Sequence, residues 1–284
     1  MAIDPEKLSI TINERDVITA LLYAAPKDRA SITLILGHGA GANQLHPFMR
    51  LFAAGLAEHG FDVLTFNFQY MEQGRRAPDP KAKLEACYRA VIETARKHKR
   101  LKGNRMVIGG KSMGGRIASQ VAADWTGLTG LTRLGNDKQP SKKVGSSTGA
   151  SDKRARKAKG GDRSGNLNVY AKGRRDDIVP QSEELAGLVF LGYPLHPPGK
   201  PEQLRDAHLP QVTVPMLFVQ GSRDAFGSAE EIRATIKKHR LRATLHVVEG
   251  GDHSLKVPKT RGIPQDEIYG ATMDAIASWI QKLS

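Results

Sequence analysis

Cysteine is nearly absent from this sequence of 284 residues, in which Cys87 is the only one. A disulfide framework or a thiolate metal cluster within one chain is therefore excluded. Long apolar runs are also missing, since nothing approaches about eighteen consecutive apolar residues, and this excludes a transmembrane helix. The N-terminus has no basic start followed by an apolar run, so we expect no secretory signal and a soluble, cytoplasmic protein with no membrane contact.

Paired metal-ligand spacing is missing as well. Apart from His38 and His253, the histidines show none of the spacings that hold zinc, so we expect neither a metal site nor another cofactor. Hydrophobic residues nevertheless make up 39% of the chain, which is enough for one large α/β domain covering residues 1–284. The sequence does not indicate an oligomeric state.

Positive charge is concentrated in one part of the chain. Residues 126–180 hold 13 Lys and Arg against 5 Asp and Glu, so they carry +8 of the net charge of +14. They are rich in Gly and Ser and almost free of large apolar side chains, which predicts a disordered or mobile insertion within the domain. The alternative is a basic arm for a polyanion or a partner protein. Without an aromatic ladder, such contact would be weak and non-specific.

Hydrophobic patterning predicts strands that alternate with helices. Strands are expected over 7–12, 17–25, 31–39, 61–68, 105–110, 185–194, 214–224 and 243–253, and helices over 45–60, 79–100, 114–125, 228–239 and 267–283. The first two strands should form a hairpin. Strands that alternate with helices indicate a mostly parallel, doubly wound sheet with helices on both faces.

The stretch IGGKSMGGR, residues 108–116, contains both the Gly-Lys-Ser of a phosphate loop and a Gly-x-Ser-x-Gly sequence. A phosphate loop needs a glycine five residues before Gly110, and that position is Arg105. A nucleophile elbow needs an apolar strand that runs straight into the serine and a helix that follows it, which is the pattern around Ser112. The spacing therefore favours the elbow over the phosphate loop.

Three further groups follow predicted strands in the order that a serine hydrolase requires. The glycine-rich loop at residues 37–42 precedes Ser112, and Asp224 and His253 come after it. A serine hydroxyl needs an adjacent base, which His253 can supply, and Asp224 would fix the imidazole tautomer. The carboxyl ends of parallel strands share one edge of a sheet, so we expect these groups to meet there.

The oxyanion of the tetrahedral intermediate needs preorganised N–H donors. Met113, directly after the serine, should supply one; Ala40 is the first choice for the other, with Gly41 the near alternative. His38 is expected to pin the oxyanion loop and not to titrate in catalysis. Asp252 adjoins the histidine, but sequence neighbours point apart, so its carboxylate should not orient that ring.

With these residues in place, the chain resembles the α/β hydrolases. More narrowly, it resembles the predicted hydrolases related to dienelactone hydrolase, a group that includes the hydrolase-like domain of the testis-expressed protein 30 type, also found in the third subunit of the nonspecific-lethal chromatin complex. The segments that carry the resemblance are 36–43, 66–80, 109–119, 192–209, 214–227 and 250–255. The resemblance implies hydrolase ancestry without a secure substrate, and relatives that act as interaction modules keep a scaffold hypothesis open.

The segment after the sixth predicted strand is too short for a helical lid domain, so the entrance should be roofed by residues 195–213 and 70–80. Arg75 and Arg76 lie on the second of these; if they face the pocket, substrates should be short and anionic. Arg116 is expected to pack or pair structurally, with contact to an acidic substrate the lesser alternative. The sequence predicts a serine hydrolase of a small-molecule ester, thioester or related acyl bond; the alternative is a weak or inactive hydrolase-fold scaffold that binds through its basic insertion.

Overall fold

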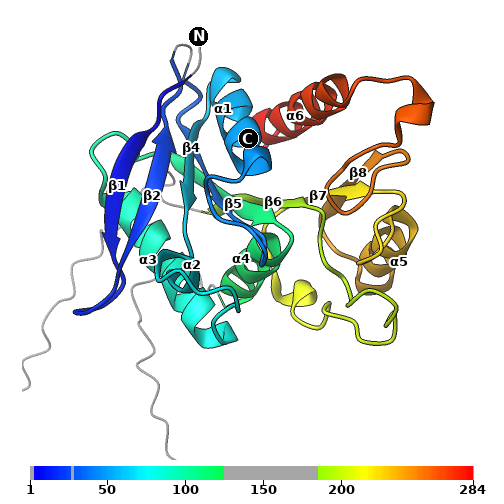
Figure 1. Ribbon diagram of the computed structural model, residues 1–284, viewed down its shortest axis with the longest axis horizontal. Coiled ribbons are helices and arrows are strands. Elements are labelled where there is room, and N and C mark those ends of the chain that lie inside the picture. The colour runs from blue at the N-terminus through cyan, green and yellow to red at the C-terminus, as the bar shows by residue number, and fades with distance from the viewer. Residues whose placement is uncertain (1–2, 27–28, 125–184, 284) are drawn as a thin grey trace, which may run out of the picture. The chain divides into compact units, whose positions relative to one another are not determined.

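The fold of the protein is seen in a computed structural model, which describes residues 3–26, 29–124 and 185–283 (Figure 1). The predicted basic insertion at 126–180, and with it the predicted polyanion contact, lies outside the described residues. The described parts on either side of it belong to one compact unit.

Eight strands of the described residues form one sheet, in the order β1-β2-β4-β3-β5-β6-β7-β8. Their bounds are β1 Glu6–Thr11, β2 Val17–Tyr23, β3 Ile32–Gly37, β4 Asp62–Phe66, β5 Arg105–Lys111, β6 Leu185–Leu191, β7 Met216–Gly221 and β8 Ala243–Val248. β2 runs antiparallel to both of its neighbours, and all other neighbouring strands are parallel. The predicted mostly parallel sheet and its opening hairpin are confirmed.

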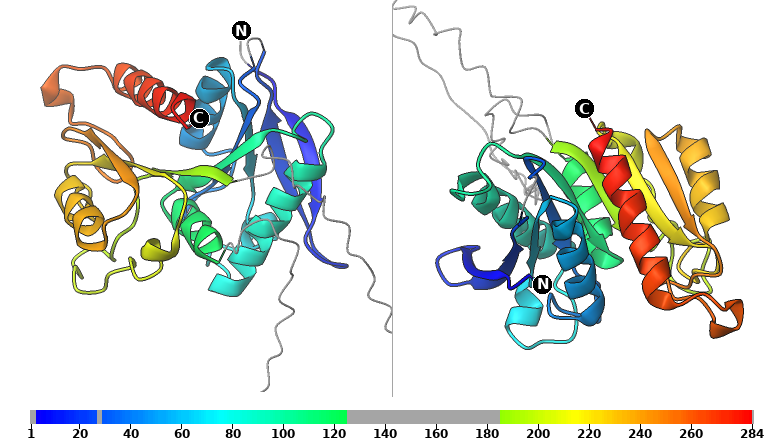
Figure 2. Two further views of the ribbon diagram at one scale, coloured as in Figure 1. Left: turned by 180° about the vertical axis from the view of Figure 1, so that it is seen from behind. Right: turned by 90° about the horizontal axis from the view of Figure 1, so that it is seen from above.

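Helices cover both faces of this sheet (Figure 2). Their bounds are α1 Pro47–Glu58, α2 Gln69–Glu72, α3 Lys81–Lys97, α4 Met113–Ala123, α5 Ala229–His239 and α6 Gln265–Gln281, with single 3-10 turns at Leu209–Gln211 and Lys259–Arg261. Apolar residues of α1 and α6 pack in one core cluster, and those of α3, α4 and α5 pack in a second. Because both faces of the sheet are buried, side chains on both sides of each strand are apolar, and the strands are nearly continuous hydrophobic runs.

Local signals set the helix ends. α5 begins at a capping box, in which the Ser228 side chain accepts from the Glu231 N–H and the Glu231 carboxylate accepts from the Ser228 N–H. α3 begins directly after Pro80 and carries Arg96 and Lys97 in its last turn, as the helix dipole favours. The short helix α2 was not expected from the sequence.

β5 and β6 pair in parallel along their length, from Met106 opposite Leu185 to Lys111 opposite Leu191. The two strands are therefore neighbours in the sheet, although residues 112–184 separate them in the chain. This pairing joins the two described halves of the molecule, and it places the end of β5 beside the end of β6.

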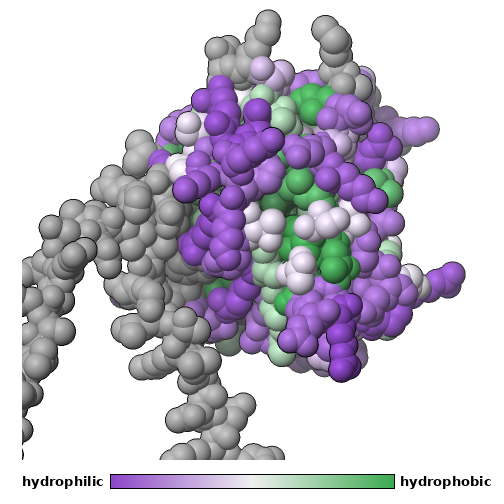
Figure 3. Space-filling view, turned by 90° about the vertical axis from the view of Figure 1, so that its left-hand side faces the viewer, coloured by the Kyte–Doolittle hydropathy of each residue, from purple (hydrophilic) through white to green (hydrophobic). Residues whose placement is uncertain are grey.

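The outermost strand β1 turns polar side chains to solvent, with Glu6, Lys7, Ser9 and Thr11 all exposed. Exposed charges on an edge strand discourage pairing with another chain. The face of the molecule on the β1 and β2 side is accordingly hydrophilic over most of its area, with a smaller apolar region (Figure 3).

No lid domain follows β6 in the described chain. Between β6 and β7 the only helical element is the 3-10 turn at Leu209–Gln211. Within the ranges that the structure describes, no helix is both long enough and apolar enough to cross a membrane.

Candidate active site

The residue at the end of β5 has a strained backbone. Ser112 has φ 50° and ψ −115°, outside the regions that side chains other than glycine prefer. A Cβ on Gly110 or on Gly114 would collide with the carbonyl oxygen of Gly37 on the neighbouring strand. The two glycines thus let β5, the turn and α4 approach β3 closely. This strand–turn–helix geometry is that of a nucleophile elbow and not that of a phosphate loop.

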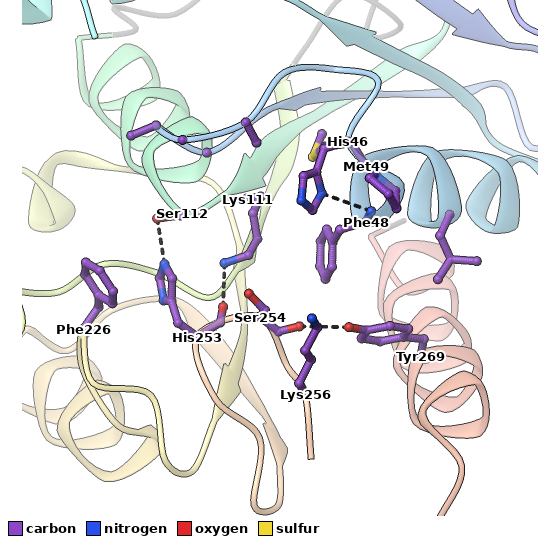
Figure 4. Close-up of a pocket in the computed structure, with 16 residues that line it drawn as sticks. His46, Phe48, Met49, Lys111, Ser112, Phe226, His253, Ser254, Lys256 and Tyr269 are labelled. Atoms are coloured by element: carbon purple, nitrogen blue, oxygen red, sulfur yellow. Dashed lines mark hydrogen bonds between the residues drawn. The ribbon is translucent and has the colours of Figure 1, made fainter. Parts of the chain in front are cut away.

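Three side chains predicted from separate parts of the chain meet at this turn. Ser112 Oγ lies 2.8 Å from His253 Nε2 (Figure 4). On the other side of the ring, His253 Nδ1 lies 2.8 and 3.0 Å from the two carboxylate oxygens of Asp224. Asp224 follows β7 and His253 follows β8, so all three groups lie at the carboxyl edge of the sheet.

The carboxylate of Asp224 is buried and held by two further donors. Its Oδ2 accepts from Gln220 Nε2 at 2.8 Å, and its Oδ1 accepts from the Phe226 N–H at 2.8 Å. Gln220 is itself fixed, because its side-chain oxygen accepts from the Tyr193 N–H at 2.8 Å. With both oxygens occupied in this way, the carboxylate presents a fixed acceptor to the Nδ1–H of His253.

The loop after β3 is tied down by two aromatic side chains. His38 donates from Nδ1 to the Gly39 carbonyl at 2.8 Å and accepts at Nε2 from the Phe68 N–H at 3.1 Å. Burial lowers the pKa of His38 to about 4, so its ring is neutral. The ring fixes the loop through these two hydrogen bonds, as the sequence predicts. The hydroxyl of Tyr70 donates to the Ala40 carbonyl at 2.9 Å.

The N–H groups of Met113, Ala40 and Gly41 have no acceptor within the part of the chain that the structure describes. Met113 opens α4, where the first N–H groups of a helix lack an intrahelical partner. Ala40 lines both cavities beside Ser112, and Gly41 lines one of them. Free donors therefore stand next to the serine.

Two cavities of different character meet at Ser112. The larger, of about 610 Å³, is mostly apolar and is lined by side chains of α1 and α6, with Phe48 and Tyr269 among them (Figure 4). The smaller, of about 290 Å³, is lined in part by Arg116 and Arg205. Both cavities are also lined by Ser112, Ala40 and Phe226.

Comparison with known proteins places this geometry in a family. The model of the family described as alpha/beta hydrolase domain matches residues 30–158 and 170–281, which is most of the chain. The protein belongs to the α/β-hydrolase family.

Solved structures with the same fold include dienelactone hydrolase from Anabaena variabilis, at 15% identity, a TM-score of 0.60, and coverage of 98% of this chain and 97% of that one. A lidless α/β serine hydrolase from Xanthomonas campestris has 14% identity, a TM-score of 0.59, and coverage of 98% and 96%. An esterase from Pyrococcus furiosus has 13% identity, a TM-score of 0.60, and coverage of 99% and 93%. The resemblance to the α/β hydrolases is thereby confirmed, and these solved structures share the fold. The narrower relationship to dienelactone hydrolase and to the type of testis-expressed protein 30 and the nonspecific-lethal complex stays a prediction.

In this α/β hydrolase the second acidic residue near the histidine turns away, as expected. Asp252 Oδ1 accepts from the N–H groups of Ser254 and Lys256, at 2.7 and 2.9 Å. It shapes the loop that carries His253 without touching the ring.

The structure does not bring Arg75 or Arg76 into either cavity. Arg75 pairs with Asp79 at 2.6 Å and donates to Gln73, and Arg76 is exposed. The two predicted roofing segments do reach the small cavity, through Pro78 and Asp79 on one and through Arg205 on the other.

Sequence reasoning missed Lys111, the residue before the serine. Its Nζ donates to the His253 carbonyl at 2.5 Å, lies 5.8 Å from the centre of the Phe48 ring, and lines the large cavity. Gly192, at φ 68°, leaves room for this contact, since a Cβ there would lie 3.1 Å from the ammonium. Burial lowers the pKa of Lys111 to about 8. Gln220 was missed as well; a polar residue at the end of an apolar strand was the available signal.

Within the described ranges, no three His, Cys, Asp or Glu side chains gather in a way that could hold a metal ion. Cys87 is buried, and burial raises the pKa of its thiol to about 12. The arrangement at the carboxyl edge of the sheet thus consists of a hydroxyl, an imidazole, a carboxylate and free backbone donors.

Proposed function

We propose that the protein is a serine hydrolase that cleaves carboxylic esters, thioesters or related acyl bonds through an acyl-enzyme. The observation that carries this proposal is the unbroken chain of hydrogen bonds from Ser112 Oγ through His253 to Asp224. That chain lies at a strained elbow and opens on two cavities. A buried network that ends in a hydroxyl at a cavity is suited to nucleophilic attack.

In the first half of the reaction, Ser112 Oγ attacks the carbonyl carbon of the substrate while its proton passes to His253 Nε2. Asp224 stabilises the imidazolium that forms and remains ionised. When the tetrahedral intermediate collapses, the bond to the leaving-group oxygen or sulfur breaks. His253 gives its proton to that atom, and the acyl group stays on the serine as an ester.

In the second half, water attacks the acyl carbon and His253 takes its proton. Collapse of this second intermediate returns the proton to Ser112 Oγ and releases the acid. The net reaction consumes one ester and one water and yields one carboxylic acid and one alcohol or thiol. The negative oxygen of each intermediate is proposed to lie against the N–H of Met113 and that of Ala40, with Gly41 the near alternative for the second donor.

A fluorophosphonate probe and a short p-nitrophenyl ester test the proposal together. Wild-type protein should turn over the ester and be labelled at Ser112, and Ser112→Ala should lose both, with kcat lower by about 10⁴- to 10⁶-fold. Ser254→Ala removes a hydroxyl from the same cavity and should still be labelled. Wild-type protein that neither hydrolyses an ester panel nor reacts with the probe contradicts the proposal.

A further inference from the structure

Two guanidinium groups line the small cavity beside Ser112, those of Arg116 and Arg205. Among the described residues, the Arg205 side chain makes one long contact, from Nη1 to the Pro194 carbonyl at 3.5 Å. Arg116 Nε is buried and finds no hydrogen-bond partner among those same residues. In the part of the chain that the structure describes, no carboxylate forms an ion pair with either arginine. Buried or half-buried cations without a counter-ion are costly and mark a place for an anion.

Two carboxylates near this cavity, those of Asp79 and Glu85, are each paired with another cation. Asp79 lines the same cavity and is paired with Arg75 at 2.6 Å. Glu85 is paired with Lys81 at 3.3 Å. Within the described structure, the guanidinium groups of Arg116 and Arg205 are therefore left without a paired carboxylate, and both line the cavity.

The two arginines are held in place by their backbones. Arg205 donates its N–H to the Leu195 carbonyl at 2.8 Å, and its own carbonyl accepts from the Tyr193 hydroxyl at 2.9 Å. Arg116 lies in the first turn of α4, and its N–H donates to the Ser112 carbonyl at 3.1 Å. Burial and the Arg205 charge both lower the pKa of Arg116, in keeping with the place of both cations on the wall of one cavity. A carboxylate between them would relieve that repulsion with charge-assisted hydrogen bonds.

The position of His253 decides which part of a substrate enters each cavity. The leaving-group atom must lie within reach of His253 Nε2, because it receives its proton from that nitrogen. His253 lines the large cavity and not the small one. Phe226 stacks on the imidazole with 4.1 Å between ring centres and lies on the opposite side of His253 from Phe48 (Figure 4). Phe226 itself lines both cavities, whereas the imidazole lines only the large one. The leaving group belongs in the large cavity and the acyl group in the small one.

We infer that the preferred substrates are esters or thioesters whose short acyl group ends in a carboxylate, held by Arg116 and Arg205, and whose leaving group is apolar. This inference rests on the proposed hydrolase function and names its substrate class. A half-ester of a short dicarboxylic acid would react with one water at Ser112, and the products are the free dicarboxylate and an apolar alcohol or thiol. The small cavity, at about 290 Å³, suits a short acyl chain, and the apolar lining of the large one suits the leaving group.

Phenyl succinate, the half-ester, and phenyl butyrate provide a matched pair of substrates. Both acyl groups have four carbons, and they differ in whether the far end is a carboxylate or a methyl group. After subtraction of the rate in buffer, the wild-type kcat/KM for the half-ester should exceed that for the butyrate by about 10- to 100-fold, the range expected of charge-assisted hydrogen bonds. Arg205→Gln and Arg116→Gln should each lower this ratio by about tenfold.

Arg76→Gln is the matched control, since it removes one positive charge from an exposed arginine that lines neither cavity. It should leave the ratio within about twofold of wild type. Thermal melting shows whether each variant folds, and Arg116→Lys, which keeps the charge, should retain part of the preference. A wild-type ratio near one overturns the inference, as does a ratio that both glutamine variants leave unchanged. A carboxylate can also be placed on the phenyl ring of the butyrate ester, which puts it on the leaving group. If this raises kcat/KM more than the carboxylate on the acyl group does, the assignment of the two cavities is overturned.

A binding measurement separates this inference from the proposed function. Ser112→Ala protein is titrated calorimetrically with N-phenylsuccinamate and with N-phenylbutyramide, the amide analogues of the two esters. Tighter binding of the succinamate that is lost in the Ser112→Ala, Arg205→Gln double variant supports the inference even if no ester is turned over, in which case the hydrolase proposal fails alone. If wild-type protein hydrolyses both esters at equal rates and the two amides bind equally, the substrate class is wrong and the hydrolase proposal stands.

Discussion

Two aspartates are buried at opposite ends of the sheet, and their partners differ in kind. Asp62 opens β4, at the edge away from the elbow, and accepts from Arg29 Nε at 2.6 Å and from Arg100 Nε at 2.8 Å. The Ala25 N–H and the Asn104 side-chain amide complete its shell, at 3.1 and 3.3 Å. Every partner of Asp62 is a donor that keeps its proton at any ordinary pH.

Asp224 is equally buried and equally well bonded, but one of its partners can gain or lose a proton. Behind it stand Gln220 and a backbone N–H, and in front of it stands His253. The hydrogen bonds of Asp224 continue through His253 to the Ser112 hydroxyl, which faces two cavities. A carboxylate paired with permanent cations serves the fold, whereas one paired with a titrating ring can serve a reaction. The sharpest tests remove each aspartate in turn.

The largest expected effect is that of Asp224→Asn on turnover. The amide cannot accept the Nδ1–H as a carboxylate does, so the ring loses its tautomer and the imidazolium loses its counter-charge. We expect kcat to fall by about 10⁴-fold. Stability should fall by only about 1–3 kcal/mol, because the new NH2 must face one of the two donors to the carboxylate. Asp252→Asn is the control, because Asp252 adjoins His253 in sequence but bonds only backbone N–H groups. A similar loss in both variants would contradict the assignment of Asp224.

The next effect, on stability, is that of Asp62→Ala. This change leaves two arginines, an asparagine and a backbone N–H without their acceptor. Because Arg29 and Arg100 are each about one-third exposed and can reach water, we expect a loss of about 2–4 kcal/mol, somewhat less than for a fully buried pair. Urea unfolding measures it. Asp274→Ala removes an exposed partner of His59 and should cost less than about 0.5 kcal/mol. Equal costs for the two changes would show that the Asp62 network does not hold the sheet.

The smallest effect concerns Lys111, a half-buried cation without a carboxylate at hydrogen-bond distance in the described structure. Its pKa is lowered from 10.5 to about 8 in the folded state. Between pH 8 and 10.5 the unfolded chain therefore binds more protons than the folded one, and stability rises with pH across that window. Relative to Lys111→Met, the free energy of unfolding of the wild type should rise by up to about 3 kcal/mol between pH 8 and pH 10.5. Unfolding at several pH values checks this, with exposed Lys83→Met as the control. If the difference in unfolding free energy between the wild type and Lys111→Met does not change with pH, the Lys111 ammonium is exposed to solvent.

Much of the fold could be predicted from the sequence, because strands buried on both faces are nearly continuous apolar runs and the helices between them are amphipathic. Ser112, Asp224 and His253 could be placed at one edge because each lies at or just after the carboxyl end of a predicted strand. Arg75 could not be placed, since its capture by Asp79, four residues on, depends on side-chain geometry. Periodicity also gives no sign that Arg205 lines the cavity beside the serine.

Arg205 reaches the small cavity through a loop whose path is set by non-local bonds to Leu195 and Tyr193. The contact between Lys111 and the His253 carbonyl similarly joins residues far apart in the chain. Such contacts decide which side chains line a cavity, and a pattern read along one strand or helix does not contain them. Individual strand ends could therefore be predicted more reliably than the cavities between them.

The direct pairing of β5 with β6 also has a consequence for how the molecule assembles. Ser112 comes before residues 125–184, and Asp224 and His253 come after them. Bringing together two strands that lie far apart in the chain costs conformational entropy before any β5–β6 bond is gained, and pairing of distant segments is slow compared with local structure. We therefore expect helices and the β1–β2 hairpin to form early in refolding, and the three-residue network to form only when the halves join. Recovery of the proposed esterase activity would then report when the two halves join, while circular dichroism would follow the earlier local steps.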